Sequence, residues 1–304
     1  MGPTGAGKSE FALRLAAQLP IEIISVDSAQ VYRGMDIGTA KPSVDERVRV
    51  AHHLLDLRDP TQSYSAGEFV VDARIALREI LARGRIPLLV GGTMLYFRAL
   101  LGGMAVLPRA SSAVRTALDA RAAREGWPAL HAELARVDPG AAARIHPNDP
   151  RRIQRALEVH AVTGRPISDL WAVRESPDQA APEFGFASWA LVPGSRPMLH
   201  ARLEQRFNAM MQLGFLDEVR ALHARGDLCM TNTSMRAVGY RQLWAHVAGE
   251  VTLEQASVQA VAATRQLAKR QLTWLRSWPA VQRIDPFSTD SFEHFRAAVL
   301  QLLQ

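Results

Sequence analysis

Short apolar runs alternate with amphipathic stretches along the first hundred residues of the chain. Three runs carry the β-branched residues or leucines that are typical of buried strands: 21–26, 53–57 and 86–90. Apolar residues recur every three or four positions at 10–19 and at 65–81, which predicts helices there. Ser65 followed by Glu68 predicts a capping box at the start of the second helix. Strands that alternate with helices indicate a parallel, doubly wound α/β sheet.

The pattern changes at about residue 108. Residues 111–171 have helical spacing and almost no strand pattern, with helices predicted at 114–124, 129–137, 139–145 and 150–163. The polar, proline-containing stretch 175–184 predicts a loop. A strand pattern returns at 186–192, and long helices are predicted at 199–211 and 253–278. We therefore expect a core made of 1–107 and 186–304, interrupted by an all-helical insertion at 108–185.

The first residues carry the clearest chemical motif. They match the phosphate-binding loop (P-loop) pattern of Gly, four residues, then Gly-Lys-Ser, and read Gly2, Pro3, Thr4, Gly5, Ala6, Gly7, Lys8, Ser9. Glycines let backbone amides surround an anion, and the N-terminus of the following helix adds a positive dipole end. Lys8 can reach the outer phosphate, and the Ser9 hydroxyl can bind Mg²⁺. The loop predicts a diphosphate or triphosphate ligand; a glycine-rich turn is the alternative.

The loop lacks its usual preceding strand. A P-loop normally follows a buried apolar strand, but only Met1 precedes Gly2. We therefore expect that the native chain begins further upstream, because a central sheet position would otherwise be empty.

Two further positions are candidates for chemistry because they follow strands. Asp27 follows the first predicted strand, and ligands of α/β sheets bind beyond the carboxyl ends of strands. Its carboxylate can accept a proton or hold a metal, or it can cap the next turn. The third predicted strand ends at Gly91-Gly92-Thr93, where P-loop nucleotide hydrolases usually carry an acidic residue for Mg²⁺. Thr93 can bind a phosphate oxygen, cap a helix, or both. The missing acid argues against an ordinary ATPase or GTPase.

Composition narrows the class of protein. The 304 residues are 48% hydrophobic, no run approaches 18 apolar residues, and one cysteine, Cys229, excludes an internal disulfide. The formal net charge is +6, which fits a polyanionic partner, although an arginine-rich composition also fits genome bias. Basic residues cluster in the insertion and on the last long helix, at Arg144, Arg151, Arg152, Arg155, Arg265, Lys269, Arg270 and Arg276. A solvated helix face is the alternative to nucleic-acid binding. Only three lysines occur, Lys8, Lys41 and Lys269, which hints at a need for a compact ammonium there.

These features are consistent with three hypotheses about the function of the protein. The first is group transfer from a diphosphate or triphosphate donor to a nucleic acid. The second is a small-molecule kinase that uses ATP and closes a helical lid. The third is a nucleotide-gated RNA-binding protein, which predicts a base-reading motif and a magnesium acid that the sequence lacks.

Seven segments decide between them, because together they resemble the bacterial tRNA dimethylallyltransferases (tRNA isopentenyltransferases). The segments occur in order along nearly the whole chain, at 2–9, 27–32, 34–42, 87–96, 144–149, 239–242 and 264–271. The departure from the family pattern is the absent first strand. The resemblance implies transfer of a dimethylallyl group from dimethylallyl diphosphate to the exocyclic N6 amine of adenosine 37, beside the tRNA anticodon. It also implies Mg²⁺ as cofactor, a cytoplasmic monomer and no membrane association.

The resemblance also implies residue roles. The P-loop, Thr93 and Arg206 would hold the leaving diphosphate, and Asp27 would accept the amine proton after the adenine leaves its stack. Residues expected to face the tRNA are Asp27, Ser28, Ala29, Gln30, Thr93, Arg115, Arg151, Arg152, Ile153, Gln154, Arg155, Arg236, Ala237, Val238, Gly239, Tyr240, Arg241, Arg265, Lys269 and Arg270. A related enzyme acting on free adenine nucleotides would share the core, but the long basic insertion argues against it.

Overall fold

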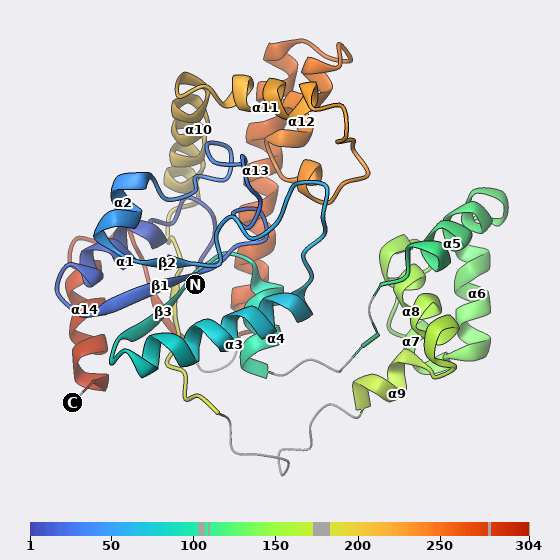
Figure 1. Ribbon diagram of the computed structural model, residues 1–304, viewed down its shortest axis with the longest axis horizontal. Helices are drawn as coiled ribbons and strands as arrows, with labels where there is room; N and C mark the ends of the chain where they lie inside the picture. Colours follow the sequence, from blue (N-terminus) through green and yellow to red (C-terminus); the bar gives the residue numbers. More distant parts are fainter. Residues whose placement is uncertain (103–106, 109, 173–182, 279–280, 304) are drawn as a thin grey trace. The chain divides into compact units, whose positions relative to one another are not determined.

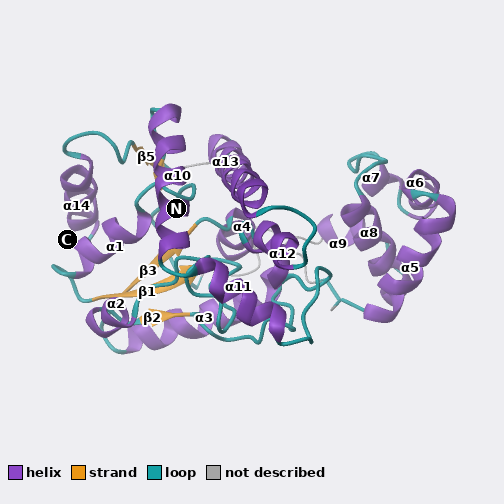
Figure 2. Cartoon of the chain, turned by 90° about the horizontal axis from the view of Figure 1, so that it is seen from above, coloured by secondary structure: helices purple, strands orange, loops and turns teal. Residues whose placement is uncertain are grey.

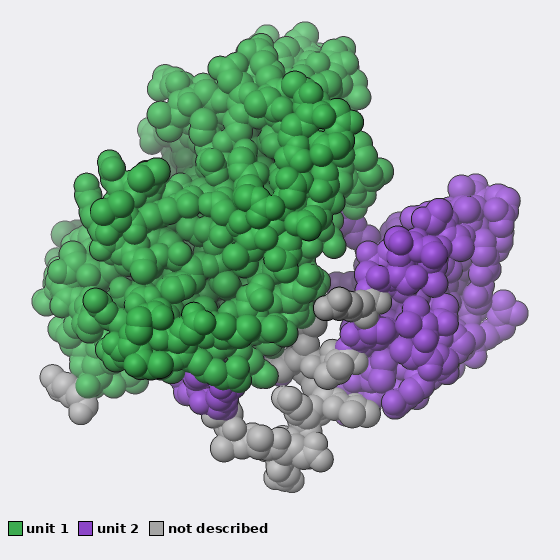
Figure 3. Space-filling view, viewed as in Figure 1, with its two compact units in different colours: residues 1–101, 186–304 green, residues 102–185 purple. Residues whose placement is uncertain are grey.

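The computed structural model describes residues 1–102, 107–108, 110–172, 183–278 and 281–303. Its contacts divide the chain into two compact units (Figure 1, Figure 3). Unit 1 combines Met1–Leu101 with Phe186–Gln304, and unit 2 is Gly102–Gly185. Unit 1 is mixed α/β with parallel strand pairing, and the elements described in unit 2 are helices.

A parallel three-stranded sheet forms the centre of unit 1. Strand β1 (Ile21–Val26) lies between β2 (His52–His53) and β3 (Ile86–Gly91). All six β1 residues are buried, as expected of a central strand. β1 pairs with β3 along its whole length, with Val26 opposite Gly91. Asp27 and Thr93 therefore leave the sheet at the same edge.

Helices cover both faces of this sheet (Figure 2). On one face, α1 (Lys8–Ala16) packs against β1 and β3, and α14 (Ser291–Leu302) packs against α1, within a core that includes Phe11, Leu15, Ile21, Ile23, Phe292 and Phe295. On the other face lies α3 (Ala66–Ala82). It begins with the predicted capping box, in which Ser65 Oγ accepts from the Glu68 amide and Glu68 Oε2 accepts from the Ser65 amide. The predicted helices at 10–19 and 65–81 are thus confirmed, with ends shifted by one to three residues.

The strand predicted at 53–57 is wrong after His53. Leu54 and Asp56 have φ of +65° and +57°, which breaks the extended backbone that a ladder needs. The Asp56 carboxylate accepts hydrogen bonds from Lys41 Nζ at 2.6 Å and Arg47 Nη1 at 2.8 Å. A tertiary ion-pair network therefore sets the backbone where the leucine pattern alone favours a strand.

A second, two-stranded parallel sheet joins β4 (Trp189–Leu191) to β5 (Gln282–Ile284). β4 confirms the returning strand but is shorter than the predicted 186–192, and β5 was not predicted. Met1 runs beside β4 as a parallel neighbour. Its nitrogen donates to the Trp189 carbonyl at 2.7 Å, and its carbonyl accepts from the Leu191 amide at 2.9 Å. The chain thus enters the phosphate loop directly from the edge of β4.

The remaining helices of unit 1 come from distant segments of the chain. They are α2 (Val44–Arg49), α4 (Met94–Gly102), α10 (Arg196–Gln212), α11 (Phe215–Ala224), the short 3₁₀ helix Ser234–Arg236, α12 (Tyr240–Val247) and α13 (Leu253–Arg276). α10 and α13 confirm the predicted helices at 199–211 and 253–278. They pack against each other through Leu199, Leu203 and Ala268.

Unit 2 has its own hydrophobic core. Its helices are α5 (Ser112–Glu125), α6 (Trp127–Val137), α7 (Pro139–Ala142), α8 (Pro150–Thr163) and α9 (Ile167–Ala172). Leu130, Leu134 and Ile153 are fully buried at its centre. The four predicted helices are present, although the third ends at Ala142 rather than at 145. Most of the predicted loop at 175–184 lies outside the described residues.

Within the part of the chain that the structure describes, no helix is both long enough and apolar enough to cross a bilayer.

Candidate active site

The glycine-rich loop has the geometry of an anion cradle. Gly5 and Gly7 both have φ of +79°, in the left-handed region that favours glycine. α1 starts directly after Gly7 without a side-chain cap, so its first backbone amides are available to an anion. Lys8 Nζ folds back over the loop and donates to the Pro3 carbonyl at 2.7 Å. The loop can therefore present both amides and an ammonium to a phosphate group.

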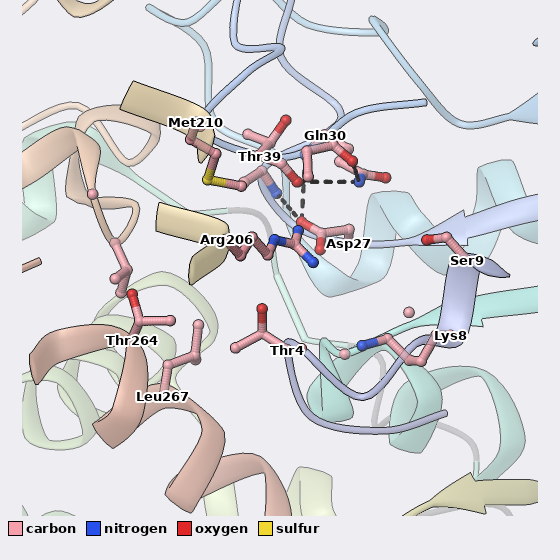
Figure 4. Close-up of a pocket in the computed structure, with 18 of the residues that line it drawn as sticks. Thr4, Lys8, Ser9, Asp27, Gln30, Thr39, Arg206, Met210, Thr264 and Leu267 are labelled. Atoms are coloured by element: carbon pink, nitrogen blue, oxygen red, sulfur yellow. Dashed lines mark hydrogen bonds between the residues drawn. The ribbon is translucent and has the colours of Figure 1, made fainter. Parts of the chain in front are cut away.

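A cavity of about 640 Å³ opens above this loop. The P-loop side of its wall comes from Thr4, Gly5, Gly7, Lys8 and Ser9. Asp27 and Gln30 belong to the segment that follows β1. Apolar side chains complete the wall from α10 and α13, including Leu203, Phe207, Met210 and Leu267. Figure 4 shows these polar and apolar groups around one space.

Asp27 is held by the turn that follows β1. Its Oδ1 accepts from the Ala29 amide at 2.8 Å and from the Gln30 amide at 3.4 Å. The structure therefore confirms that Asp27 caps the turn, which was one of the roles predicted from the sequence. Among the described residues Oδ2 accepts no hydrogen bond, and Asp27 lines the cavity. One oxygen thus fixes the carboxylate while the other is left for chemistry.

Two basic side chains make the cavity electropositive. Figure 4 shows the Arg206 guanidinium directed at Asp27, with Lys8 on the P-loop side. Burial and the charge of Arg206 together lower the pKa of Lys8 to about 8, while the charge of Asp27 opposes the shift. Burial also lowers the pKa of Arg206. A bound polyanion would stabilise the charged forms of both groups.

The end of β3 lies against the Asp27 turn. Thr93 Oγ1 accepts from the Ser28 amide at 3.1 Å and lies 3.4 Å from Ser28 Oγ. A Cβ at Gly91 would overlap the Val26 carbonyl, so this position needs glycine. The structure therefore brings Thr93 beside Asp27 and Ser28, although Thr93 is not among the residues that line the cavity.

Lys41 anchors the loop 34–42, which contributes Gly38, Thr39, Ala40 and Pro42 to the cavity wall. Its ammonium is buried and donates to the Tyr32 carbonyl at 2.7 Å and to the carboxylates of Asp36 and Asp56. Three donors thus meet three acceptors, which suits an ammonium better than a planar guanidinium. The rarity of lysine in the sequence was the only indication of this role.

Glu218 on α11 is a second anchor, and nothing in the sequence pointed to it. Its carboxylate accepts from the amides of Asp36 at 2.8 Å, Ile37 at 2.7 Å and Gly38 at 3.2 Å. It also accepts from the Tyr240 hydroxyl. Residues about 180 positions apart therefore meet at the loop, which no local pattern can reveal.

The predicted tRNA-facing residues of unit 1 fall into two groups. Ala29, Gln30, Ala237, Val238, Gly239 and Tyr240 line the cavity. The Tyr240 side chain is buried, so it supports the wall rather than offering its hydroxyl. Outside the cavity lining, Arg241, Lys269 and Arg270 are exposed, Arg236 Nε donates to the Met230 carbonyl at 3.2 Å, and Arg265 pairs with Glu204 at 2.8 Å.

In unit 2 the predicted residues surround a buried carboxylate, Glu158. It accepts from Arg115 Nε at 2.9 Å, Arg155 Nη1 at 2.7 Å and the Ser111 amide at 2.7 Å. Burial alone would raise the pKa of Glu158, but the hydrogen bonds from both arginines outweigh it and lower the pKa. These two arginines are therefore committed to an ion pair within the unit.

The other predicted residues of unit 2 differ in their access to solvent. Arg151 and Arg152 are exposed at the start of α8, and Arg152 lies 3.4 Å from Asp149. Gln154 donates to Asp119 at 2.7 Å. Ile153 is fully buried, so its side chain packs the core rather than facing a ligand. Arg151 and Arg152 are thus the better candidates for contact with a phosphate backbone.

The class of protein follows from the cavity in unit 1. A cationic phosphate loop, a fixed carboxylate and apolar walls suit an α/β enzyme that transfers a group from a phosphate ester to a nucleophile. Residues 30–278 match the family model described as IPP transferase. The chain belongs to this family, that of the tRNA dimethylallyltransferases.

Relatives and solved structures agree with this assignment. The chain is 60% identical over 278 residues to the tRNA dimethylallyltransferase of Bordetella petrii. The matched residues make up 91% of this chain and 88% of that protein. Identity to the Burkholderia vietnamiensis tRNA dimethylallyltransferase is 54% over 291 residues, covering 96% and 90%.

Among solved structures, the tRNA isopentenylpyrophosphate transferase of Bacillus halodurans matches with a TM-score of 0.71 at 37% identity, covering 99% of this chain and 94% of that one. A eukaryotic dimethylallyltransferase described as acting on tRNA matches with a TM-score of 0.81 at 26% identity, covering 99% and 77%. The resemblance drawn from sequence segments is confirmed, and the kinase reading gains no support.

Proposed function

We propose that this enzyme transfers a dimethylallyl group from dimethylallyl diphosphate to the N6 amine of adenosine 37 in tRNA, and releases pyrophosphate. The observation that carries the proposal is one cavity in unit 1, which combines a phosphate cradle, apolar walls and the Asp27 carboxylate. A diphosphate fits the cradle, a five-carbon group fits the apolar wall, and an amine needs a proton acceptor. tRNA as acceptor fits the formal net charge of +6. An enzyme that acts on tRNA would work in the cytoplasm.

The leaving group needs the strongest stabilisation, because negative charge develops on the diphosphate as the allylic carbon–oxygen bond breaks. Backbone amides of the P-loop, the Lys8 ammonium and the Arg206 guanidinium would supply it. Lys8 now donates to the Pro3 carbonyl, so it would exchange that bond for a phosphate oxygen. Thr93 would act at the same edge of the sheet after releasing Ser28.

Asp27 would act as the general base. Its Oδ1 is fixed by two backbone amides, which keeps the carboxylate oriented toward the cavity that would receive the adenine. The N6 nitrogen forms a bond to the allylic carbon, the carbon–oxygen bond to the diphosphate breaks, and the amine proton passes to Asp27. The adenine has to leave its stack in the anticodon loop to reach this position.

Mg²⁺ fits the residues present. The described residues contain no cluster of three or more acidic, histidine or cysteine side chains that could hold a metal alone. Mg²⁺ commonly uses one or two protein oxygens together with phosphate oxygens and waters. The exposed Ser9 hydroxyl, which lines the cavity beside Lys8, is such an oxygen. Bound there, the ion would neutralise charge on the diphosphate.

We further interpret the fold as a doubly wound P-loop core, formed by 1–107 and 186–304, with a tRNA-binding helical insertion at 108–185. The helical content of unit 2 and the exposed Arg151 and Arg152 support this interpretation. We expect the enzyme to act as a monomer.

The proposal is tested by incubating the enzyme with dimethylallyl diphosphate, Mg²⁺ and unmodified tRNA, then analysing nucleosides by mass spectrometry. Dimethylallyl adenosine should appear with tRNA that has adenosine 37 and be absent when guanosine replaces it. Equal or faster modification of free AMP would instead support the alternative acceptor. No product with any acceptor would contradict the proposal.

A further inference from the structure

Gln271 of α13 forms a bridge that the proposed chemistry does not use. Its Oε1 accepts from the Thr4 amide at 2.9 Å, and its Nε2 donates to the Gly92 carbonyl at 2.8 Å. Thr4 belongs to the phosphate loop, and Gly92 directly precedes Thr93. One half-buried side chain therefore ties together three segments that are remote in sequence.

The chemistry of this bridge requires an amide. Thr4 offers a donor and Gly92 offers an acceptor, and a glutamine side chain presents the complementary acceptor and donor in one group. Glutamate would lose the donor, and methionine, of similar length, would lose both bonds. The fit also explains Gly92, because a Cβ there would overlap Gln271 Nε2.

The helix that carries Gln271 also borders the cavity and the predicted RNA surface. Leu267 and Thr264, one and two turns earlier, line the cavity. Lys269 and Arg270, directly before Gln271, are exposed and are candidates for tRNA contact. A shift of α13 caused by RNA on Lys269 and Arg270 would thus reach the phosphate loop through Gln271.

A second contact path runs through α10. The buried Leu203 packs with Ala268 of α13, and a Cβ at Gly5 would lie 2.7 Å from Leu203 Cδ2. The phosphate loop is therefore clamped between α10, which carries Arg206, and α13. In this clamp Gln271 makes the directional, polar contact to the loop backbone.

We propose that Gln271 is a positioning residue that holds the phosphate loop in its anion-binding form and couples diphosphate binding to RNA docking on α13. The positioning of the loop stands on the contacts alone, whereas the coupling to RNA rests on the proposed function. Coupling is reciprocal: if tRNA tightens pyrophosphate binding, pyrophosphate tightens tRNA binding by the same factor.

The test compares Gln271→Met with Gln266→Met, an exposed glutamine on the same helix. Isothermal titration measures the Kd of pyrophosphate with Mg²⁺, with and without saturating tRNA. The ratio of these two constants is the coupling factor. Thermal unfolding of each variant establishes that it is folded.

We expect Gln271→Met to bind pyrophosphate roughly tenfold more weakly, the equivalent of about 1.4 kcal/mol, and its coupling factor to fall to about one. Gln266→Met should match the unmodified enzyme in both. A residue that only stabilises the fold would lower the melting temperature and leave the coupling factor unchanged. Pyrophosphate binding within twofold of the unmodified enzyme, together with an unchanged coupling factor, would overturn the proposal.

A double-mutant cycle tests the contact between Gln271 and Gly92 directly. Gly92→Ala should displace the Gln271 amide and weaken pyrophosphate binding, whereas adding it to Gln271→Ala should cost little more, because no amide remains to displace. Fully additive losses would count against the bridge. These measurements use pyrophosphate and tRNA rather than prenyl transfer. An enzyme that binds both and transfers nothing would therefore refute the proposed function but not the role of Gln271.

Discussion

At the scale of single residues, the account depends on a carboxylate and an ammonium in different surroundings. Asp27 is fixed by backbone amides and faces the cavity, so its carboxylate is oriented to accept a proton there. Lys8 is half-buried near Arg206, so its charge is easier to lose than that of an ordinary lysine. The role of Asp27 is therefore tested by substitution, and the role of Lys8 by the pH dependence of donor binding.

Replacing Asp27 with asparagine should remove the base and preserve the turn, because the amide oxygen can still accept from Ala29 and Gln30. We expect kcat to fall by about 10²–10⁴-fold, with the Kd values for tRNA and pyrophosphate within a few-fold of the original. Single-turnover kinetics and binding titrations measure both. Asp45→Asn, an exposed acid on α2, is the matched control. Turnover of Asp27→Asn within tenfold of the unmodified enzyme would rule out the base assignment.

The lowered pKa of Lys8 predicts how donor binding depends on pH. Below pH 8 the ammonium is charged and can bind a phosphate oxygen, whereas above pH 8 an increasing fraction is neutral. The affinity for dimethylallyl diphosphate should therefore fall as pH rises from 8 to 9.5, by up to about tenfold per unit. Lys8→Arg should bind more weakly but with a flat profile over this range. A flat profile in the unmodified enzyme would contradict the predicted titration of Lys8.

At the scale of elements, the loop 34–42 shows how buried ion pairs hold a cavity wall. Lys41→Met should destabilise the protein by roughly 2 kcal/mol, because three acceptors lose a charged donor. Lys269→Met, at an exposed lysine, should change stability by less than about 0.5 kcal/mol. Urea denaturation measures both. Equal stability of the two variants would show that Lys41 does not anchor the loop.

Helix α8 is the element expected to contact RNA in unit 2. Replacing Arg151 and Arg152 with alanine should lower the magnitude of the salt-dependence slope of tRNA binding by about 1.5–2, since each removes one phosphate contact. Arg165→Ala, at an exposed position just beyond the other end of α8, should leave the slope unchanged. If the slope of the double variant equals that of the unmodified enzyme, this end of α8 is only a solvated face.

Local patterns in the sequence were sufficient for elements whose own residues determine them. The helix capped by Ser65, the central β1 strand and the phosphate loop were all predictable, since caps, β-branched runs and glycine spacing act within a few residues. The strand at 53–57 failed because Lys41 and Arg47 recruit Asp56. Helix α11 was missed, and with it Glu218, whose partners lie about 180 residues away.

The residues of the candidate site also divide into those that the sequence predicts and those that depend on contacts between remote segments. Asp27, Lys8 and Ser9 were found from motif and position, and Arg206 from the resemblance. The roles of Lys41, Glu218 and Gln271 depend on contacts between remote segments, which a single sequence does not encode locally. The expected strand upstream of Met1 and the division into a core and an RNA-binding insertion stay predictions.

At the scale of the whole molecule, tRNA is expected to contact both units. The candidates are Arg151 and Arg152 in unit 2, and Lys269 and Arg270 in unit 1. Replacing each pair with alanine should weaken tRNA binding, and the combined variant should lose the sum of both effects to within about 0.5 kcal/mol, because the two pairs belong to different compact units. Gel-shift titrations measure the three variants. A combined loss no larger than that of one pair would mean that only one unit binds the RNA.

The fate of the donor atoms tests the central claim most directly. The enzyme would be given tRNA and dimethylallyl diphosphate carrying radiocarbon in the prenyl group and radiophosphorus in the diphosphate. The account predicts radiocarbon on adenosine 37 and all radiophosphorus released as intact pyrophosphate, in equal amounts. Radiophosphorus in the RNA, or release of orthophosphate without labelled adenosine, would contradict it.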